Sequence, residues 1–592
     1  MDQAANAFQD YRLSGVRRFL QTAVVIDNEA EMRAVQASSI EPKIAQRKPA
    51  GVLTRPFASP MPKASADKAV TADVPVVAGA KEPEAVPAQN AAGSLDAKLL
   101  TDAFSAREII CGLYRPEPGE NMVSLATNAA KHADMVVVDW LLENNSSVKA
   151  VEIIISILKD DIAGNGRLRL LSVYTSQSGI SVIAKELCDQ IAAVPELANK
   201  FSLAGTAIVG ANVRICVLSK PHSIGDADVE KVSEQNLPER LLEEFVLLST
   251  GLLTSFALHS ISAVRRAAHH VVAVFGEELD GAYLAHRSTL VDPDEAVEFA
   301  INLLVGELQN SIAVDERLDG QIGSDVLTAW VDAKGSSHKF LKGGAEASPE
   351  LVKEFVVGGF VKLKATKGKL TEKDGTPAEG GLLGHNVGEV FYASAAEAWQ
   401  RQIEFARLSS FKREAYGRTR LPEGWLPTLT LGSVLKVRGP KNEAEKPSYD
   451  DLGANYLVCM QPRCDSVRLI GPTGFPFQTG EAATKEFNLV VKERDLSTGT
   501  PLLISGKPGN TQVIKFDRDE VTNSVKARKD GDDFMFTDNK GREYFWLGDI
   551  KEMKAQHDAS ALAASVHRVG LVELEFLRLA AAKDVKVPAP AK

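Results

Sequence analysis

Short apolar runs rich in β-branched residues alternate with helical patterns over the first 224 residues of the chain. The most uniform run covers residues 135–138 (MVVV) and ends in Asp139 and Trp140. An uninterrupted apolar run of this kind, bounded by polar residues, is typical of a strand buried on both faces in a parallel sheet. Ligands of open α/β sheets bind beyond the carboxyl ends of the strands, which is where Asp139 is expected.

Three further runs end in polar side chains: residues 22–26 lead to Asp27 and Asn28, residues 167–174 to Thr175, and residues 213–219 to Lys220. A parallel sheet would bring these tips to one edge. Two oxygen ligands with waters suit a hard cation such as Mg²⁺, which would offset charge on an incoming phosphoryl group. A lysine and a hydroxyl could hold its other oxygens, which leaves the Asp139 carboxylate as a nucleophile. The plain alternative for a single Asp is a helix cap.

In this order, the strand-end residues resemble the receiver domain of two-component response regulators over roughly residues 15 to 224: Asp27-Asn28, Asp139, Thr175 and Lys220-Pro221. The resemblance implies a five-stranded, parallel, doubly wound sheet and a phosphorelay function.

It also implies a role for each residue. Asp139 would accept phosphate from a histidine kinase, and Lys220 would contact that phosphate. Thr175 would turn toward the phosphate as a switch, and Asp27, Asn28 and Asp139 would bind Mg²⁺.

Two residues depart from the receiver pattern. Asn28 stands where the second acid and direct metal ligand is usual, so one full charge is missing, although Glu29 next to it could compensate. Val217 stands three residues before the lysine, where the switch aromatic is usual. These departures support an alternative hypothesis, a pseudo-receiver that serves as a scaffold and docks a partner without phosphorylation.

The receiver pattern is interrupted after Glu29. Residues 35–94 are rich in Ala, Pro, Val and Lys, a composition that predicts a disordered insertion. The pattern resumes near residue 95, and residues 201–209 are expected to add a strand or hairpin before the last core strand.

The rest of the chain divides into three predicted regions. Residues 225–345 are expected to form an α-helical module, built on a long apolar helix over 237–275 and a second helix over 293–312 that follows a cap signal at Asp292. Residues 346–420 form a mixed connector with a helix over 394–412. The expected fold class is therefore multi-domain: α/β, then α, then β.

Residues 421–592 change to short strands with turn residues between them, followed by a terminal helix over 549–582. The predicted strands are 434–437, 456–460, 466–470, 487–491, 511–516 and 544–547. A Cys464-Asp465-Ser466 turn with a histidine base at His557 or His567 is a third hypothesis, an enzyme site, against a structural turn. Phosphotransfer by His259, His269 or His270 is a further alternative to packed or solvated histidines.

Composition sets limits on location and partners. The net charge of −10 argues against nucleic-acid binding by the whole chain. Five scattered cysteines fit a reducing cytoplasm, and a zinc site at Cys459 and Cys464 is not expected. The start shows no signal peptide and no apolar run could cross a bilayer, so we expect a soluble, cytoplasmic protein. The receiver resemblance implies no enzymatic activity beyond self-catalysed phosphorylation and dephosphorylation.

The whole layout also resembles large bacterial proteins that carry an N-terminal response receiver domain in phage-defence operons. The segments that carry this resemblance are VVIDNEA, MVVVDWLLE, YTSQ, LSKP, LTLGSVL and YLVCMQPRCDSVRL. It implies a histidine-kinase-like ATPase as a partner, a role in anti-phage defence and an effector protein as a further partner. The apolar pattern over 237–275 adds the expectation of a homodimer through that helix.

Overall fold

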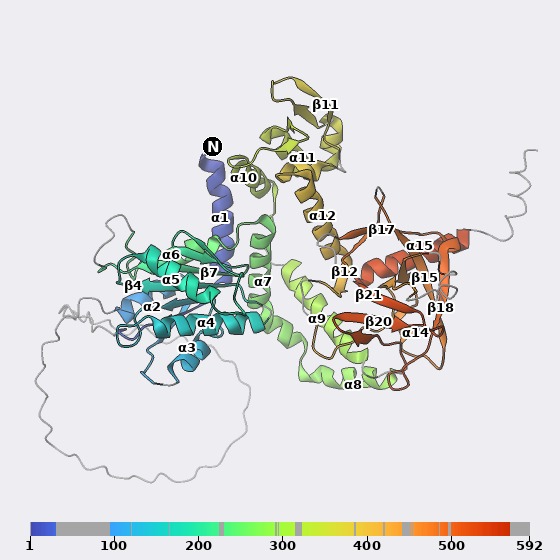
Figure 1. The fold of residues 1–592 in the computed structure, drawn as a ribbon, viewed down its shortest axis with the longest axis horizontal. Helices are drawn as coiled ribbons and strands as arrows, with labels where there is room; N and C mark the ends of the chain where they lie inside the picture. Colours follow the sequence, from blue (N-terminus) through green and yellow to red (C-terminus); the bar gives the residue numbers. More distant parts are fainter. Residues whose placement is uncertain are drawn as a thin grey trace, which may run out of the picture. The chain divides into compact units, whose positions relative to one another are not determined.

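A computed structural model describes the chain as two compact units (Figure 1). One unit contains residues 20–160 and 168–245, and the other contains residues 1–19, 161–167 and 246–592. The residues that the structure describes are 2–30, 95–119, 121–164, 166–223, 230–290, 293, 295–313, 322–366, 368–383, 386–417, 421–440, 452, 454–484, 486–494 and 499–568. The Pro-rich segment at 35–94 lies outside this part of the chain.

The first unit, residues 20–160 and 168–245, is built on a seven-stranded sheet. The sheet has the order β2-β1-β3-β4-β7-β6-β5. Its strands are β1 (Thr22–Ile26), β2 (Ile110–Tyr114), β3 (Met135–Val138), β4 (Arg169–Thr175), β5 (Ser202–Ala204), β6 (Ala207–Val209) and β7 (Val213–Ser219). Five of them are parallel, as expected, and β5 and β6 add an antiparallel hairpin at one edge. The sheet therefore has seven strands and not the predicted five, because the 201–209 segment joins it.

Helices lie between the parallel strands in sequence: α2 (Ala97–Ser105), α3 (Met122–Ala130), α4 (Val148–Ala163) and α5 (Ile180–Ala192). Helix α6 (Leu237–Val246) follows the last strand, β7. All four residues of β3 are buried, which explains its uninterrupted apolar sequence, and all seven residues of β4 are buried as well. The order of the strands reverses between β1 and β3, so the crevice at the carboxyl ends of these two strands is the place where such sheets bind ligands.

The prediction of one continuous helix over 237–275 is wrong. The structure has α6 and, after a break over residues 247–251, the separate helix α7 (Leu252–Val274). Gly251 has an extended backbone and precedes α7, and Ser249, Thr250 and Gly251 are poor helix formers. The two helices also belong to different compact units.

The second unit begins with helices: α1 (Asp2–Phe19), α7, η1 (Glu277–Leu279), α8 (Asp280–Thr289), α9 (Glu295–Ala313) and α10 (Ser324–Gly335). Helix α1 contacts α7 and α10, and Phe8, Tyr11 and Ala329 share a buried cluster. The predicted domains place residues 1–19 with the α/β domain, whereas α1 belongs to the second unit. The four-domain division stays a prediction. The expected cap at Asp292 lies outside the described residues.

A small sheet and two helices follow: β8 (Leu341–Lys342), β9 (Ala345–Glu346), α11 (Pro349–Thr366), β10 (Lys369–Thr371), β11 (Pro377–Gly381), η2 (Val387–Phe391) and α12 (Ala395–Ser410). Helix α12 confirms the helix predicted at 394–412. Its cap is Ser394, whose hydroxyl accepts a hydrogen bond from the Glu397 N–H at 3.1 Å.

The C-terminal part is an antiparallel ten-stranded sheet: β12 (Phe411–Glu414), β13 (Ser433–Val437), β14 (Tyr456–Cys459), β15 (Thr473–Ala482), β16 (Leu489–Val491), β17 (Thr500–Ile504), β18 (Thr511–Phe516), β19 (Arg528–Asp530), β20 (Asp533–Thr537) and β21 (Glu543–Ile550). Two short helical segments, α14 (Arg463–Ser466) and η3 (Pro508–Asn510), lie between its strands. Neighbouring residues such as Val434 and Leu435 belong to different buried clusters, so both faces of the sheet carry a core. The β-rich character is as predicted.

Two details of this sheet differ from prediction. The strand expected at 466–470 is absent from the described sheet, because α14 takes up the start of that segment. The terminal helix α15 (Glu552–Arg568) begins after Asp549 and Ile550, which end β21. Residues 569–582 of the predicted helix lie outside the described residues.

Among the described residues, no helix combines the length and the apolar composition that a bilayer crossing requires.

Candidate functional site

The four predicted strand ends meet at the carboxyl edge of the parallel sheet. Ile26 of β1 is in register with Val138 of β3, and Thr175 of β4 is in register with Ser219 of β7. The next backbone bonds continue these ladders: the Asp139 N–H donates to the Ile26 carbonyl at 2.9 Å, and the Lys220 N–H donates to the Thr175 carbonyl at 2.8 Å. The sheet therefore fixes where each polar side chain starts.

Lys220 joins two carboxylates at this edge. Its Nζ donates to Asp139 Oδ1 at 2.7 Å and to Asp27 Oδ2 at 2.9 Å. All three side chains are largely buried, with exposed fractions of 7% for Lys220, 2% for Asp27 and 12% for Asp139. A buried charge needs such a partner, because an unpaired one is strongly destabilising.

The second oxygen of each carboxylate is held by backbone. The Glu29 N–H donates to Asp27 Oδ1 at 2.7 Å, and the Leu141 N–H donates to Asp139 Oδ2 at 2.9 Å. Backbone donors fix the orientation of both carboxylates, so the Asp139 side chain is oriented before any ligand arrives.

Burial and charge shift the ionisation of the cluster. Burial alone would lower the pKa of Lys220, but Asp139 and Asp27 raise it above its usual value, so the ammonium persists. Burial raises the pKa of Asp139, and Lys220 opposes this effect. A carboxylate that is partly desolvated in this way is a better nucleophile than a fully hydrated one.

The residues at this edge fit a hard divalent cation. Asp27 and Asp139 provide carboxylate oxygens, and Asn28 Oδ1 is buried without a hydrogen-bond partner. An oxygen left unpaired in this position is a ready metal ligand. Within the described residues, no group of three or more His, Cys, Asp or Glu is placed to hold a metal ion.

Thr175 is buried at the end of β4. Its Oγ1 accepts a hydrogen bond from the Gln177 N–H at 3.1 Å, so the hydroxyl hydrogen remains available for donation. The structure thus places at this edge of the sheet the five residues that were predicted from the sequence: Asp27, Asn28, Asp139, Thr175 and Lys220.

Comparison with known proteins gives the same assignment for this unit. The family model described as "Response receiver domain" matches residues 19–224. Residues 19–224 are a receiver domain. The resemblance stated from the sequence is confirmed over that range, and it indicates a response-regulator-like function. No curated protein and no solved structure matches the chain.

The histidine and cysteine alternatives lie outside the receiver domain. His259 is buried in α7 and stacks on Tyr11 with 5.2 Å between ring centroids, as a packed histidine does. Cys464 is exposed in α14, and its Sγ contacts Asp465 Oδ1 at 3.6 Å. His557 is exposed on α15. These positions favour structural roles over the enzyme hypothesis, which stays untested.

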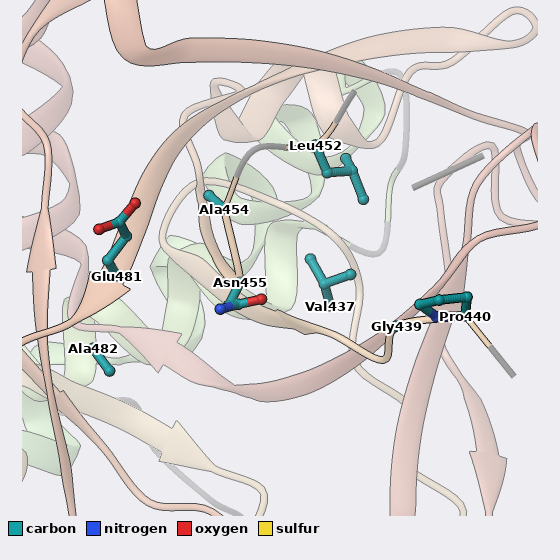
Figure 2. A pocket seen from close by; sticks show the side chains of 8 residues that line it. All are labelled: Val437, Gly439, Pro440, Leu452, Ala454, Asn455, Glu481 and Ala482. Atoms are coloured by element: carbon teal, nitrogen blue, oxygen red, sulfur yellow. The ribbon is translucent and has the colours of Figure 1, made fainter. Parts of the chain in front are cut away.

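The C-terminal sheet contains a separate hollow of about 510 Å³. Figure 2 shows its lining residues: Val437, Gly439, Pro440, Leu452, Ala454, Asn455, Glu481 and Ala482. Glu481 is the charged side chain among these lining residues, and no residue proposed for chemistry from the sequence belongs to the set. The pocket therefore adds no part to the receiver site.

Sequence reasoning missed Tyr174, the residue before Thr175. Tyr174 is buried, and Lys220 Nζ lies 5.5 Å from the centroid of its ring. A signal was present in the sequence, because an aromatic directly before the switch hydroxyl is a conspicuous large residue at a strand end.

Proposed function

We propose that the protein is a phosphorelay response regulator that accepts a phosphoryl group on Asp139. The observation that carries this proposal is the Lys220 ammonium held between Asp139 and Asp27 at the switch point of the sheet. One nucleophile, one cation and oxygen ligands for a metal lie together there. Open α/β sheets place their ligands at such an edge.

The transfer is a single displacement at phosphorus. An oxygen of Asp139 forms the new P–O bond while the bond between phosphorus and the donor histidine nitrogen breaks, and that nitrogen keeps the electron pair. The Lys220 ammonium stabilises the negative charge that develops on the phosphoryl oxygens, and the Thr175 hydroxyl donates a hydrogen bond to one of these oxygens. Hydrolysis of the acyl phosphate later restores Asp139, so the only enzymatic activity is self-catalysed phosphorylation and dephosphorylation.

Asp27, Asn28 and Asp139 would hold Mg²⁺. When bound, the cation supplies positive charge that offsets the repulsion between the carboxylates and the incoming phosphoryl group. The unpartnered oxygen of Asn28 supports this assignment.

The donor is a histidine-kinase-like ATPase, and the helical and C-terminal regions pass the signal to an effector protein, in a cytoplasmic anti-phage role. The support for this part is the resemblance of the layout to receiver proteins of phage-defence operons. Helix α7 exposes apolar side chains such as Leu253, Ile261 and Val272, and a homodimer through this helix fits the same scheme.

Mass spectrometry of the intact chain tests the proposal. Incubation with acetyl phosphate and Mg²⁺ should add one phosphate mass to the wild type and none to Asp139→Asn. The matched control is Asp102→Asn, the same change at an exposed position of α2, which should gain phosphate like the wild type. Equal labelling of Asp139→Asn would end the proposal.

A pseudo-receiver scaffold is the second candidate, because Asn28 removes one charge from the metal set. In that case the domain docks its partner through its folded surface alone. Wild-type protein would then stay unlabelled at any Mg²⁺ concentration, and Asp139→Asn would bind the partner as the wild type does. Label on Asp139 excludes this candidate.

A further inference from the structure

Tyr174 connects the receiver site to the segment that leaves the domain. It is buried at the end of β4, and its hydroxyl donates to the Val232 carbonyl at 2.7 Å, across 58 positions of sequence. The same ring lies beneath the Lys220 ammonium, 5.5 Å from Nζ to the ring centroid. That separation is within the range of a cation–π interaction. One side chain therefore contacts both the site cation and the exit segment.

Val232 is held by its other backbone group as well. Its N–H donates to the Ser219 carbonyl at 2.9 Å, and Lys231 forms a parallel bridge with Ser219. Ser219 directly precedes Lys220, just as Tyr174 directly precedes Thr175. Both backbone bonds of Val232 thus go to residues that adjoin site residues in sequence.

We call the two backbone hydrogen bonds of Val232, to Tyr174 and to Ser219, the Val232 clamp. The region around this clamp is closely packed. The Ser219 and Ser223 hydroxyls lie 2.6 Å apart, and Lys231 Nζ donates to the Ser223 carbonyl at 2.8 Å. Val232 is itself buried, with 4% of its surface exposed. Packed protein interiors yield little, so this packing can pass a small displacement at the site on to Val232.

Helix α6 begins at Leu237, five positions after Val232. The Leu237 N–H donates to the Ser233 carbonyl at 2.8 Å, so a backbone hydrogen bond connects the residue after Val232 to the first turn of α6. On the other side, α6 is tied to the domain by Glu239, which pairs with Arg107 at 3.2 Å, and Glu244, which pairs with Arg214 at 2.6 Å. A change at Val232 therefore acts on the start of the helix through which the chain leaves the receiver domain.

Tyr174 also accounts for the missing switch aromatic. Val217 on β7 takes the usual place of that ring and has none, whereas Tyr174 on the neighbouring strand is in register with Leu218, one residue further along. The aromatic is present at this edge of the sheet, but on β4 instead of β7.

We propose that Tyr174 is the positioning residue that couples Lys220 to the Val232 clamp, so that phosphorylation of Asp139 loosens the start of α6. This inference rests on the proposed phospho-acceptor role of Asp139. In the resting state, Lys220 bonds the two carboxylates and sits over the ring. A phosphoryl group on Asp139 draws the ammonium toward its oxygens and off the ring, and the hydroxyl then releases the Val232 carbonyl.

The test uses the full chain with and without acetyl phosphate and Mg²⁺, and it has two readouts. Intact mass reports phosphate on Asp139, and hydrogen exchange reports the amides of Val232 and the first turn of α6. In the wild type, phosphorylation should speed exchange of these amides by about tenfold, as a locally released segment does.

Tyr174→Phe keeps the ring and removes the hydroxyl. It should gain the same phosphate mass, exchange Val232 fast in both states, and show no further change on phosphorylation. Tyr114→Phe is the matched control, the same change at the end of β2, and should behave as the wild type. Val232→Pro removes the other bond of the clamp, its N–H, and should uncouple the amides of the first turn of α6 from phosphorylation in the same way.

The two proposals fail differently. If Tyr174→Phe is labelled normally and keeps the tenfold response, the Tyr174 relay is overturned while the phospho-acceptor role stands. If the wild type gains no phosphate, the proposed function fails first, and the relay falls with it.

Discussion

Lys220 Nζ donates a hydrogen bond to Asp139 Oδ1 at 2.7 Å, although the two residues are 81 positions apart in sequence. The contact exists because Lys220 follows β7 and Asp139 follows β3, and β4 lies between those strands in the sheet. Both side chains are largely withdrawn from water. The same ion pair therefore stabilises the folded domain and positions two residues of the candidate site.

Removal of the ammonium should destabilise the receiver domain. Lys220→Met leaves the buried carboxylates of Asp27 and Asp139 facing each other, and loss of one partner of a buried ion pair costs about 3–5 kcal/mol. Urea unfolding should show this loss in the free energy of unfolding. Lys149→Met, the same change in the more exposed Lys149–Glu152 pair, should have a far smaller effect. Equal stability of Lys220→Met and the wild type would mean that the bridge contributes nothing.

Restoration of the missing acid should strengthen metal binding. Asn28→Asp adds a charged oxygen where an unpartnered amide oxygen lies, and carboxylates are the ligands that Mg²⁺ prefers. Calorimetric titration should give a Kd for Mg²⁺ lowered roughly tenfold, which corresponds to about 1.4 kcal/mol. Asn128→Asp on the exposed side of α3 adds the same charge away from the site and should leave the Kd unchanged. A tighter Kd in both variants would point to general charge and not to ligation.

Glu493 should give the C-terminal sheet an acid-sensitive component of stability. Burial alone would raise its pKa, but hydrogen bonds from Lys436 and Tyr456 and the charge of Lys436 lower it below the usual value. A lowered pKa in the folded state means that this stabilisation is complete above the unfolded value of about 4.3 and is lost as the pH falls through the folded value. Unfolding measured from pH 7 downward should show the loss in the wild type.

The matched variant for this effect is Glu493→Gln, which cannot ionise and should lose that part of the pH dependence. Glu481→Gln, an exposed position on β15, should keep it. An unchanged pH profile in Glu493→Gln would show that other groups carry the acid sensitivity.

The residues that meet at the carboxyl edge of the receiver sheet could be predicted from the sequence because one physical rule applies to them. Apolar runs that are buried on both faces are typical of inner strands of a parallel sheet, and the carboxyl ends of such strands meet at one edge, so the sequence alone predicts that Asp139 and Lys220 lie together. The contact between Tyr174 and Val232 could not be found in this way, because it depends on how a segment beyond β7 folds back on the sheet.

The C-terminal region was less predictable for a different reason. Strand β15 contains Pro476 and two glycines, Gly474 and Gly480, and such residues usually mark edges and turns. Tertiary pairing on both sides of β15 overrides that local preference. Residues 466–470 have strand-like composition, yet the short helix α14, which follows Pro462, includes the first of them, Ser466.

The central claim is that Asp139 itself carries the phosphoryl group. Borohydride reduction of an aspartyl phosphate converts the residue to homoserine, so peptide sequencing of the labelled, reduced chain identifies the acceptor directly. We predict homoserine at position 139 in the wild type after incubation with acetyl phosphate and Mg²⁺. Homoserine at another aspartate, or an unaltered Asp139 in a labelled chain, would contradict the claim.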